Sequence, residues 1–208
     1  MSKKINFDLE LELEIRDRNG KIIHKETRKA ESFVQNFLNF LAGCLAKQDR
    51  SPWDVNNVAQ LISPYISPAS GVDVEMEIMN VLAGDGEDAY GIVVGSGTTS
   101  PGATDYNLES KITHGVSSGQ LQYGAVELEA FGLTDNTTYL QFKRVFTNGS
   151  GADVTVNEIG LIAKWYRKVG TDEQGPYYFL LIRDVLASSV IVPDGASLTV
   201  RYKLQTTT

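Results

Sequence analysis

Hydrophobic and polar residues alternate strictly at the start of the chain, from Ile5 to Arg16. A period of two residues places the apolar side chains on one face of a strand and the acidic side chains on the other. The pair Asn19-Gly20 follows, and such a pair favours the positive φ angles of a tight hairpin turn. Residues 21–28 are then the return strand. The pattern predicts a β-hairpin with one buried face.

A different period comes next, because apolar residues recur every three or four positions from Phe33 to Leu45. This spacing predicts one amphipathic helix near residues 31–47, with an apolar stripe that packs on the sheet. The only cysteine, Cys44, lies in this stripe, so we expect it to be a small buried hydrophobic residue. One cysteine can form neither an intrachain disulfide nor a structural zinc site.

The remainder of the chain predicts short strands separated by turns. Residues 48–71 contain three prolines, and we interpret them as an ordered loop with a short helix near 54–62. Beyond this loop, strands are expected at residues 72–81, 90–97, 119–131, 138–148, 153–166, 177–186 and 190–204. Turn signals fall between or within the last of them, at Asn148-Gly149, Gly175-Pro176 and Pro193-Asp194-Gly195.

Eight or more strands joined by turns, with a single helix, predict a mainly β protein. The expected architecture is an antiparallel β-sandwich or jelly-roll-like barrel with one amphipathic helix near residues 31–47. Neither an internal repeat nor a low-complexity linker is found, so we expect a single domain over residues 1–208. Within it, residues 1–50 form a strand, hairpin and helix element that we expect to serve attachment or assembly.

The charge of the chain restricts its partners. The net charge of −7 disfavours a general nucleic-acid binder, because neutralising phosphates requires an excess of lysine and arginine. The charge is unevenly distributed, since residues 1–50 contain 10 basic and 8 acidic groups and residues 51–208 contain 9 and 18. The candidate interaction surface comprises the basic residues of the hairpin and two aromatic residues of the following loop: Lys21, Lys25, Arg28, Lys29, Trp53 and Tyr65.

These basic side chains have two interpretations. In the first, they pair across the strands with the glutamates of the first strand. In the second, they contact another molecule, such as packaged DNA, in a salt-dependent way. No apolar run is long enough to span a membrane, and no signal peptide is recognised at the start of the sequence. We therefore expect a protein made in the cytoplasm, without a membrane partner.

Motifs for catalysis and metal binding are weak. Neither His24 nor His114 has a partner at metal-ligand spacing, and the glycine-rich segment GSGTTSPG lacks the lysine of a phosphate-binding loop. The acidic turn at residues 83–91 does not match the calcium loop of an EF-hand. The pair Arg183-Asp184 interrupts an apolar strand, which predicts buried structural ion pairing rather than a catalytic carboxylate. We expect no enzymatic activity, no cofactor and no metal site.

Four segments of the C-terminal half carry a resemblance: GIVVGSGTTSPGATDYNLESKI (91–112), RVFTNGSGADVTVNEIGLIA (144–163), LLIRDVL (180–186) and VIVPDGASLTVRYKLQTT (190–207). Over residues 91–207 the chain resembles tailed-phage virion structural proteins of the β-sandwich type, which include decoration, neck and tail components. The resemblance implies no catalytic residues. It does not extend to the N-terminal hairpin and helix.

The resemblance implies a non-enzymatic virion component, made in the host cytoplasm, that self-assembles and docks on the major capsid or tail proteins. A capsid decoration protein is the first placement, because a compact acidic sandwich with a more basic N-terminal segment suits binding on an outer shell. A tail, neck or fibre-base protein is the alternative. A different class is a carbohydrate-binding receptor-recognition module, suggested by aromatic residues expected on loops: Trp53, Tyr65, Tyr106, Trp165 and Tyr166.

Overall fold

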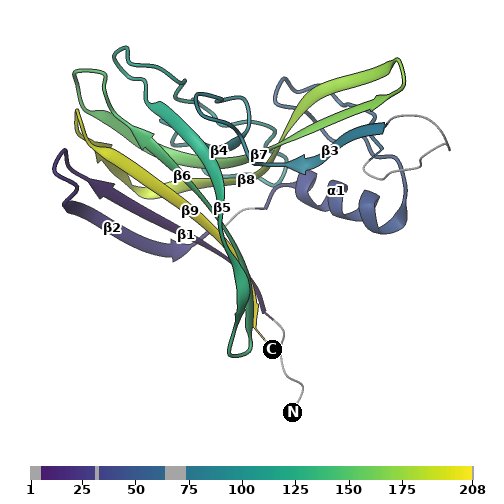
Figure 1. Ribbon diagram of the computed structural model, residues 1–208, viewed down its shortest axis with the longest axis horizontal. Helices are drawn as coiled ribbons and strands as arrows, with labels where there is room; N and C mark the ends of the chain where they lie inside the picture. The colour runs from purple at the N-terminus through teal and green to yellow at the C-terminus, as the bar shows by residue number, and fades with distance from the viewer. Residues whose placement is uncertain (1–5, 31–32, 64–73, 208) are drawn as a thin grey trace.

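The chain folds into two antiparallel sheets packed face to face, a β-sandwich with one helix beside it (Figure 1). The computed structural model describes residues 6–30, 33–63 and 74–207. Nine strands and one α-helix lie in these ranges. The expected mainly β fold with a single helix is therefore confirmed.

The first sheet has five strands in the order β2-β1-β9-β6-β5. These are β1 (Asn6–Arg16), β2 (Ile22–Lys29), β5 (Gln122–Thr134), β6 (Thr137–Thr147) and β9 (Ser197–Thr207). The predicted N-terminal hairpin is present as β1 and β2, but its first strand also pairs over its whole length with the last strand of the chain. The two edges of the sheet, β2 and β5, are consequently contributed by two separate hairpins.

The second sheet is organised around its longest internal strand, β7 (Val154–Val169). Strand β8 (Asp172–Val192) pairs along one edge of β7. The other edge of β7 pairs with two strands in turn: residues 158–162 pair with β4 (Gly91–Gly95), and residues 164–169 pair with β3 (Val74–Asn80). Residues 158–163 of β7 are buried almost without alternation, since both faces of this strand are covered.

The core lies between the two sheets. Leu9, Leu11, Leu13 and Ile15 of β1 are all buried, as the strict alternation predicts. Trp165 of β7 is completely buried as well and stacks on a tyrosine of β8. The expectation that this tryptophan is an exposed loop aromatic is wrong, because it lies in the middle of a strand that faces the core.

The helix α1 (Gln35–Ala46) packs through Phe40, whose ring centroid lies 5.1 Å from that of Phe179 on β8. Cys44 is exposed, which contradicts the prediction of a buried cysteine. The apolar residues of the sequence extend round more of the helix than the sheet covers. Packing therefore selects only part of the predicted stripe, and Cys44 lies outside the covered part.

Two local predictions are wrong. Residues 54–62 form a turn with an isolated bridge between Trp53 and Ala59, not a helix. The Asp54 carboxylate accepts two backbone N–H groups of this turn, which competes with helical hydrogen bonding. The chain also does not turn at Gly175-Pro176, because β8 runs through this pair. Among the described strands β8 pairs with β7, and Pro176 lies in an irregular part of this register, where its missing N–H is tolerated.

Candidate functional site

A narrow arm projects from the body of the sandwich (Figure 1). We define the arm as residues 128–142, the outer part of the β5–β6 hairpin, together with residues 203–206 of β9 that pair with β6. The four-stranded pairing continues into it, because Phe131, Leu140, Leu204 and Leu9 are opposite one another in register. The arm is thus an extension of the first sheet beyond the second.

The inner face of the arm is apolar and is not covered by the second sheet. Exposure rises across the row from Leu9, which is buried, to Phe131, which is 74% exposed. Leu128 and Leu133 of the same strand are 50% and 69% exposed. The opposite face of the arm has polar and charged side chains, including Gln141 and Lys203. The arm therefore keeps one apolar and one polar face, as in the sandwich, although the second sheet does not cover its apolar face.

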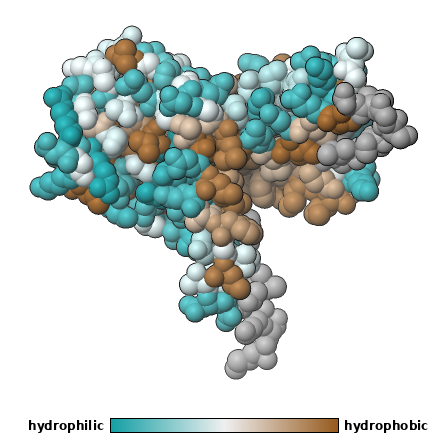
Figure 2. Space-filling model, viewed as in Figure 1, coloured by the Kyte–Doolittle hydropathy of each residue, from teal (hydrophilic) through white to brown (hydrophobic). Residues whose placement is uncertain are grey.

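Helix α1 has a second exposed apolar surface. Leu38, Leu41 and Leu45 are spaced as one helical stripe and are 42–79% exposed. Figure 2 shows hydrophobic residues on the underside of the body near α1 and on the upper part of the arm. We call the arm's inner face and this helical stripe the apolar surface. Exposed apolar patches of this kind typically mark sites of protein association.

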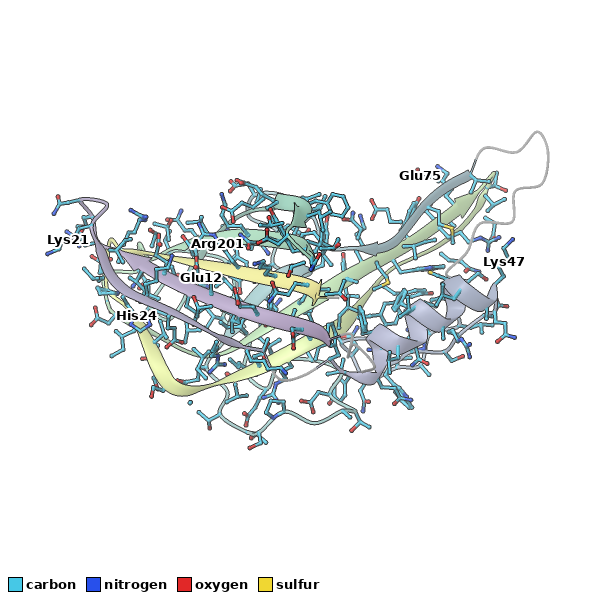
Figure 3. All side chains as sticks on the ribbon, turned by 90° about the horizontal axis from the view of Figure 1, so that it is seen from below. Glu12, Lys21, His24, Lys47, Glu75 and Arg201 are labelled. Atoms are coloured by element: carbon cyan, nitrogen blue, oxygen red, sulfur yellow. The ribbon has the colours of Figure 1, made fainter. Side chains whose placement is uncertain are left out.

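The outer face of the first sheet is crossed by a chain of ion pairs. Consecutive pairs at 2.8–3.5 Å connect all five strands in the order Lys25, Glu12, Arg201, Glu129, Lys143 and Glu127. Figure 3 places Glu12 and Arg201 next to each other on neighbouring strands. Each exposed pair is worth only about 0–1 kcal/mol. Together, these ion pairs nevertheless give each of the six charged side chains an oppositely charged partner on the same face of the sheet.

The five predicted interaction residues that the structure describes do not form one cluster. Lys25 lies 3.1 Å from Glu12, and Lys29 pairs with an aspartate of β1, as the cross-strand interpretation expects. Arg28 points elsewhere and donates a hydrogen bond to a backbone carbonyl of β8. Lys21 is exposed at the hairpin end of the molecule (Figure 3). The four basic residues of the set therefore do not all lie on one face.

Of the two aromatic members of the predicted set, Trp53 lies away from these basic side chains. Trp53 is beside α1, since its backbone N–H and carbonyl are both hydrogen-bonded to the Asn36 amide. Tyr65 lies outside the described residues. Asn36 is a buried polar residue of the helix that the apolar periodicity did not identify.

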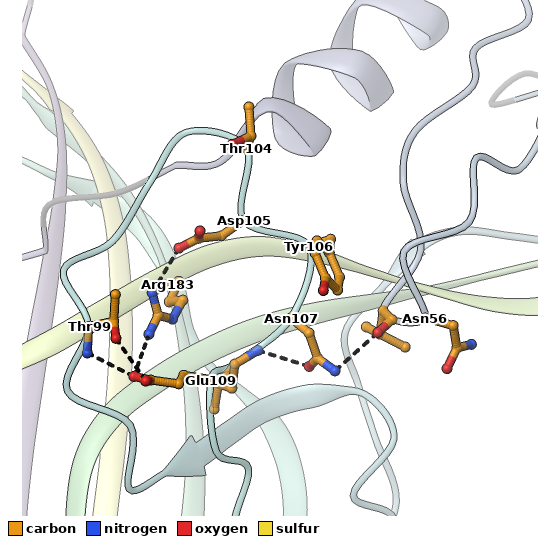
Figure 4. Close-up of a pocket in the computed structure, with 10 residues that line it drawn as sticks. Asn56, Thr99, Thr104, Asp105, Tyr106, Asn107, Glu109 and Arg183 are labelled. Carbon is orange, nitrogen blue, oxygen red and sulfur yellow. Dashed lines mark hydrogen bonds and ion pairs between the residues drawn. The ribbon is translucent and has the colours of Figure 1, made fainter.

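A pocket of about 590 Å³ lies over the buried Arg183 of β8 (Figure 4). The Arg183 guanidinium lies 2.9 Å from Glu158 of β7 and 2.8 Å from Asp105 of the loop. Glu109 flanks it on the other side at 3.8 Å. Burial lowers the pKa of Arg183, but the hydrogen bonds and charges of Asp105 and Glu158 raise it by more than burial lowers it. The pKa of Arg183 therefore lies above its usual value.

Glu158 holds the loop of residues 96–112 against the sheet. Its carboxylate is fully buried and accepts the backbone N–H groups of Gly97, Glu109 and Ser110 at 2.7–3.1 Å. A Cβ atom at position 97 would lie 2.5 Å from this carboxylate. Gly97 of the GSGTTSPG segment is therefore required by a close approach to the buried charge, and no phosphate-binding role is needed to explain it.

The pair Arg183-Asp184 is buried, as the sequence predicts, and its two side chains lie on opposite faces of β8. Successive side chains of a strand point to opposite faces. Arg183 faces the loop, and Asp184 accepts a hydrogen bond from the Tyr202 hydroxyl of β9 at 2.8 Å inside the core. The pKa of Tyr202 is raised well above its usual value by burial and by Asp184.

Sequence reasoning missed Arg144 of β6. This side chain is buried and donates hydrogen bonds to five backbone carbonyls, those of Gly84, Glu87, Tyr90, Ile92 and Gly124. Burial lowers the pKa of Arg144 to about 10. The alternation Phe142, Arg144, Phe146 places it on the inner face and was the available signal. Its role is to fix the turn before β4.

The acidic turn also has a structural arrangement. Asp88 pairs with Lys111 at 3.1 Å and accepts the backbone N–H of His114. Within the described ranges, no group of three or more histidine, cysteine, aspartate or glutamate side chains is placed to hold a metal ion. In the same ranges, no helix is long and apolar enough to cross a membrane.

Comparisons of the chain with descriptions of protein families, with curated proteins and with solved structures find no match. The resemblance to phage virion proteins accordingly receives no support from them and stays a proposal.

Proposed function

We propose that this chain is a non-enzymatic structural component of a tailed-phage virion, which assembles with further copies of itself through the apolar surface. The observation that carries the proposal is the uncovered inner face of the arm. A sheet whose apolar side continues past its partner sheet exposes to water a surface built for burial. A structural subunit in a larger particle would bury it.

A second copy of the chain is the occupant that the arm fits best. The arm is apolar on one face, so its receptor must be apolar as well. Helix α1 presents such a stripe in Leu38, Leu41 and Leu45. The chain thus contains both halves of a heterologous contact. Contacts of this kind form rings when the rotation between copies closes and filaments when it does not.

The free energy gained by burying the apolar surface favours a closed assembly. The three arm residues and three helix residues together expose the equivalent of about four apolar side chains, which is worth roughly 6–11 kcal/mol on burial. Association itself costs about 4–15 kcal/mol. One such contact is therefore weak in solution. In a ring each copy makes two contacts, so a ring or a surface array is more stable than an isolated pair.

Sedimentation of the purified protein tests the self-association. We expect a discrete oligomer for the unaltered chain and a monomer for the double variant Phe131→Ser and Leu133→Ser. Ile191→Ser is the matched control, because Ile191 is 52% exposed but lies on β8, outside the apolar surface. A monomeric unaltered chain at high concentration, or an oligomer that the arm variant leaves intact, would overturn the assembly through the arm.

Within the virion, we place the chain first as a capsid decoration protein, with tail, neck or fibre base as the alternative. The acidic body and the more basic first 50 residues support binding on an outer shell. Virions labelled with an antibody to this chain and viewed in negative stain test the placement. Label over the whole capsid supports decoration. Label along the tail or at one vertex supports the alternative, and the absence of label from intact and opened virions contradicts a virion role.

A further inference from the structure

We infer that the cleft between residues 53–57 and the loop 99–109 is a binding site for a neutral carbohydrate. This site is separate from the arm and goes beyond the proposed structural role. It consists of the pocket over Arg183 and an adjoining depression of about 300 Å³, which share Thr104, Asp105 and Tyr106. The combined size is typical of ligand sites, which usually measure about 300–1,000 Å³.

Two aromatic rings line the cleft. Trp53 is 49% exposed and Tyr106 is 38% exposed, and both line the smaller depression. The sequence suggested both as sugar-stacking candidates, and the structure brings them together from segments about fifty residues apart. The face of an aromatic ring is electron-rich, and it packs favourably against the C–H groups on one face of a sugar ring. Each side chain also has a polar tip, an N–H or an O–H, of the kind that bonds a sugar hydroxyl group.

Amide and hydroxyl groups accompany the rings. Asn56 and Asn57 are exposed on one wall, and Thr104 is exposed on the other. An amide side chain donates and accepts hydrogen bonds at once, as does a hydroxyl. Sugar hydroxyls have the same dual character. The cleft therefore offers matched partners to a polyol, whereas a lipid or other apolar ligand would leave these groups unpaired.

The charge of the cleft selects against anions. Arg183 at its floor is surrounded by Asp105, Glu109 and Glu158, so three carboxylates surround one guanidinium. A phosphate or a nucleic acid would meet net negative charge. A neutral sugar pays no such electrostatic cost.

The walls of the cleft are held in place before any ligand binds. The Asn107 side-chain amide donates to the Val55 carbonyl at 3.1 Å and so joins the two walls (Figure 4). Asp54 fixes the turn of the first wall through two backbone N–H groups. Glu158 clamps the loop of the second wall. Such preorganisation lowers the entropy cost of binding.

A glycan array containing both neutral and acidic oligosaccharides, probed with the full chain, is the first test. The strongest neutral oligosaccharide is then titrated by calorimetry against the unaltered chain and against Trp53→Ala and Tyr106→Ala. We expect each variant to weaken binding at least tenfold. Tyr139→Ala is the matched control, because Tyr139 is a partly exposed tyrosine of the arm, outside the cleft. We expect it to bind as the unaltered chain does.

Tryptophan fluorescence gives a readout that needs no variant. The chain has two tryptophans, of which Trp165 is buried and Trp53 is exposed. The oligosaccharide should therefore protect Trp53 from quenching by acrylamide. Binding of no neutral glycan on the array, binding of acidic glycans alone, or binding without protection of Trp53 would each overturn the inference. None of these outcomes bears on self-association, which sedimentation measures separately.

Discussion

The buried carboxylate of Glu158 provides the sharpest test of how this fold is held together. We consider the substitution Glu158→Gln, which keeps the shape of the side chain and removes its charge. One carboxylate oxygen accepts the N–H groups of Gly97 and Ser110, and the other accepts that of Glu109 and the Arg183 guanidinium. All four of these partners are hydrogen-bond donors. The glutamine side-chain amide would replace one of the two carboxylate oxygens by an NH2 group. At either position this NH2 donor would face N–H donors in a buried site.

The expected cost follows from the burial. Glu158 is 0% exposed and Arg183 is 3% exposed, so water cannot replace the lost charge. Breaking a buried ion pair by altering one partner typically costs about 3–5 kcal/mol. For a chain of this length each kcal/mol lowers Tm by about 2–4 °C, so the variant should melt roughly 6–20 °C lower. The loop of residues 96–112 should also become more susceptible to proteolysis, since this carboxylate holds it.

Urea unfolding followed by circular dichroism measures the free energy of unfolding of the variant. The control is Glu129→Gln on the outer face of the first sheet, where the carboxylate lies 2.8 Å from Arg201 but is accessible to water. This exposed pair should contribute no more than about 1 kcal/mol. If Glu158→Gln destabilised the protein no more than this control does, the argument from burial would be refuted.

Four further predictions concern other parts of the chain. Gly97→Ala should lower the free energy of unfolding by at least about 1 kcal/mol in urea unfolding, because its Cβ would lie 2.5 Å from a buried carboxylate oxygen; an unchanged midpoint would contradict this. Arg144→Met should cost at least about 3 kcal/mol in the same assay, since five carbonyl oxygens lose their donor. Burial raises the pKa of Asp88 and of Glu129, but hydrogen bonds and cationic neighbours lower both below their usual values. Their stabilisation is therefore complete above about pH 5, beyond both unfolded pKa values, and it is lost as the pH falls through the folded pKa values. Melting curves should shift down in acid, and a flat profile from pH 5 to 2 would be inconsistent with these pairs. Cys44 should react with a maleimide in the folded protein, more slowly than an unperturbed thiol because partial burial raises its pKa; protection until unfolding would instead restore the buried position that the sequence suggested.

The apolar periodicity of the sequence determines most of the local structure. It predicts the N-terminal hairpin, the helix and the strands that become β3 to β7, because alternation depends only on which face of each element is buried. It also predicts that Arg183 and Asp184 are buried. It fails at residues 54–62, where the Asp54 side chain stabilises a turn, and at Gly175-Pro176, where an edge strand tolerates proline.

The candidate sites are less predictable from sequence. Trp53 and Tyr106 are both visible as aromatic residues in loops, but nothing in the local pattern places them in one cleft. The loop clamp of Glu158 likewise joins residues about fifty to sixty positions apart. The basic residues of the hairpin looked like one surface, but Lys25 and Lys29 pair with acidic residues of the first strand while Arg28 donates to a backbone carbonyl of β8.

The periods of the apolar residues are sufficient to predict a mainly β chain with one helix, since these periods follow from the geometry of each element. The tertiary structure decided how far each apolar face is covered. The first sheet extends beyond the second, so Phe131 and Leu133 are exposed on the arm, and β8 covers only one part of α1, so Leu38 and Leu45 remain in water. The physical reason is that an alternating pattern fixes which side of a strand is apolar, while coverage depends on strand pairings and sheet offsets set by contacts distant in sequence.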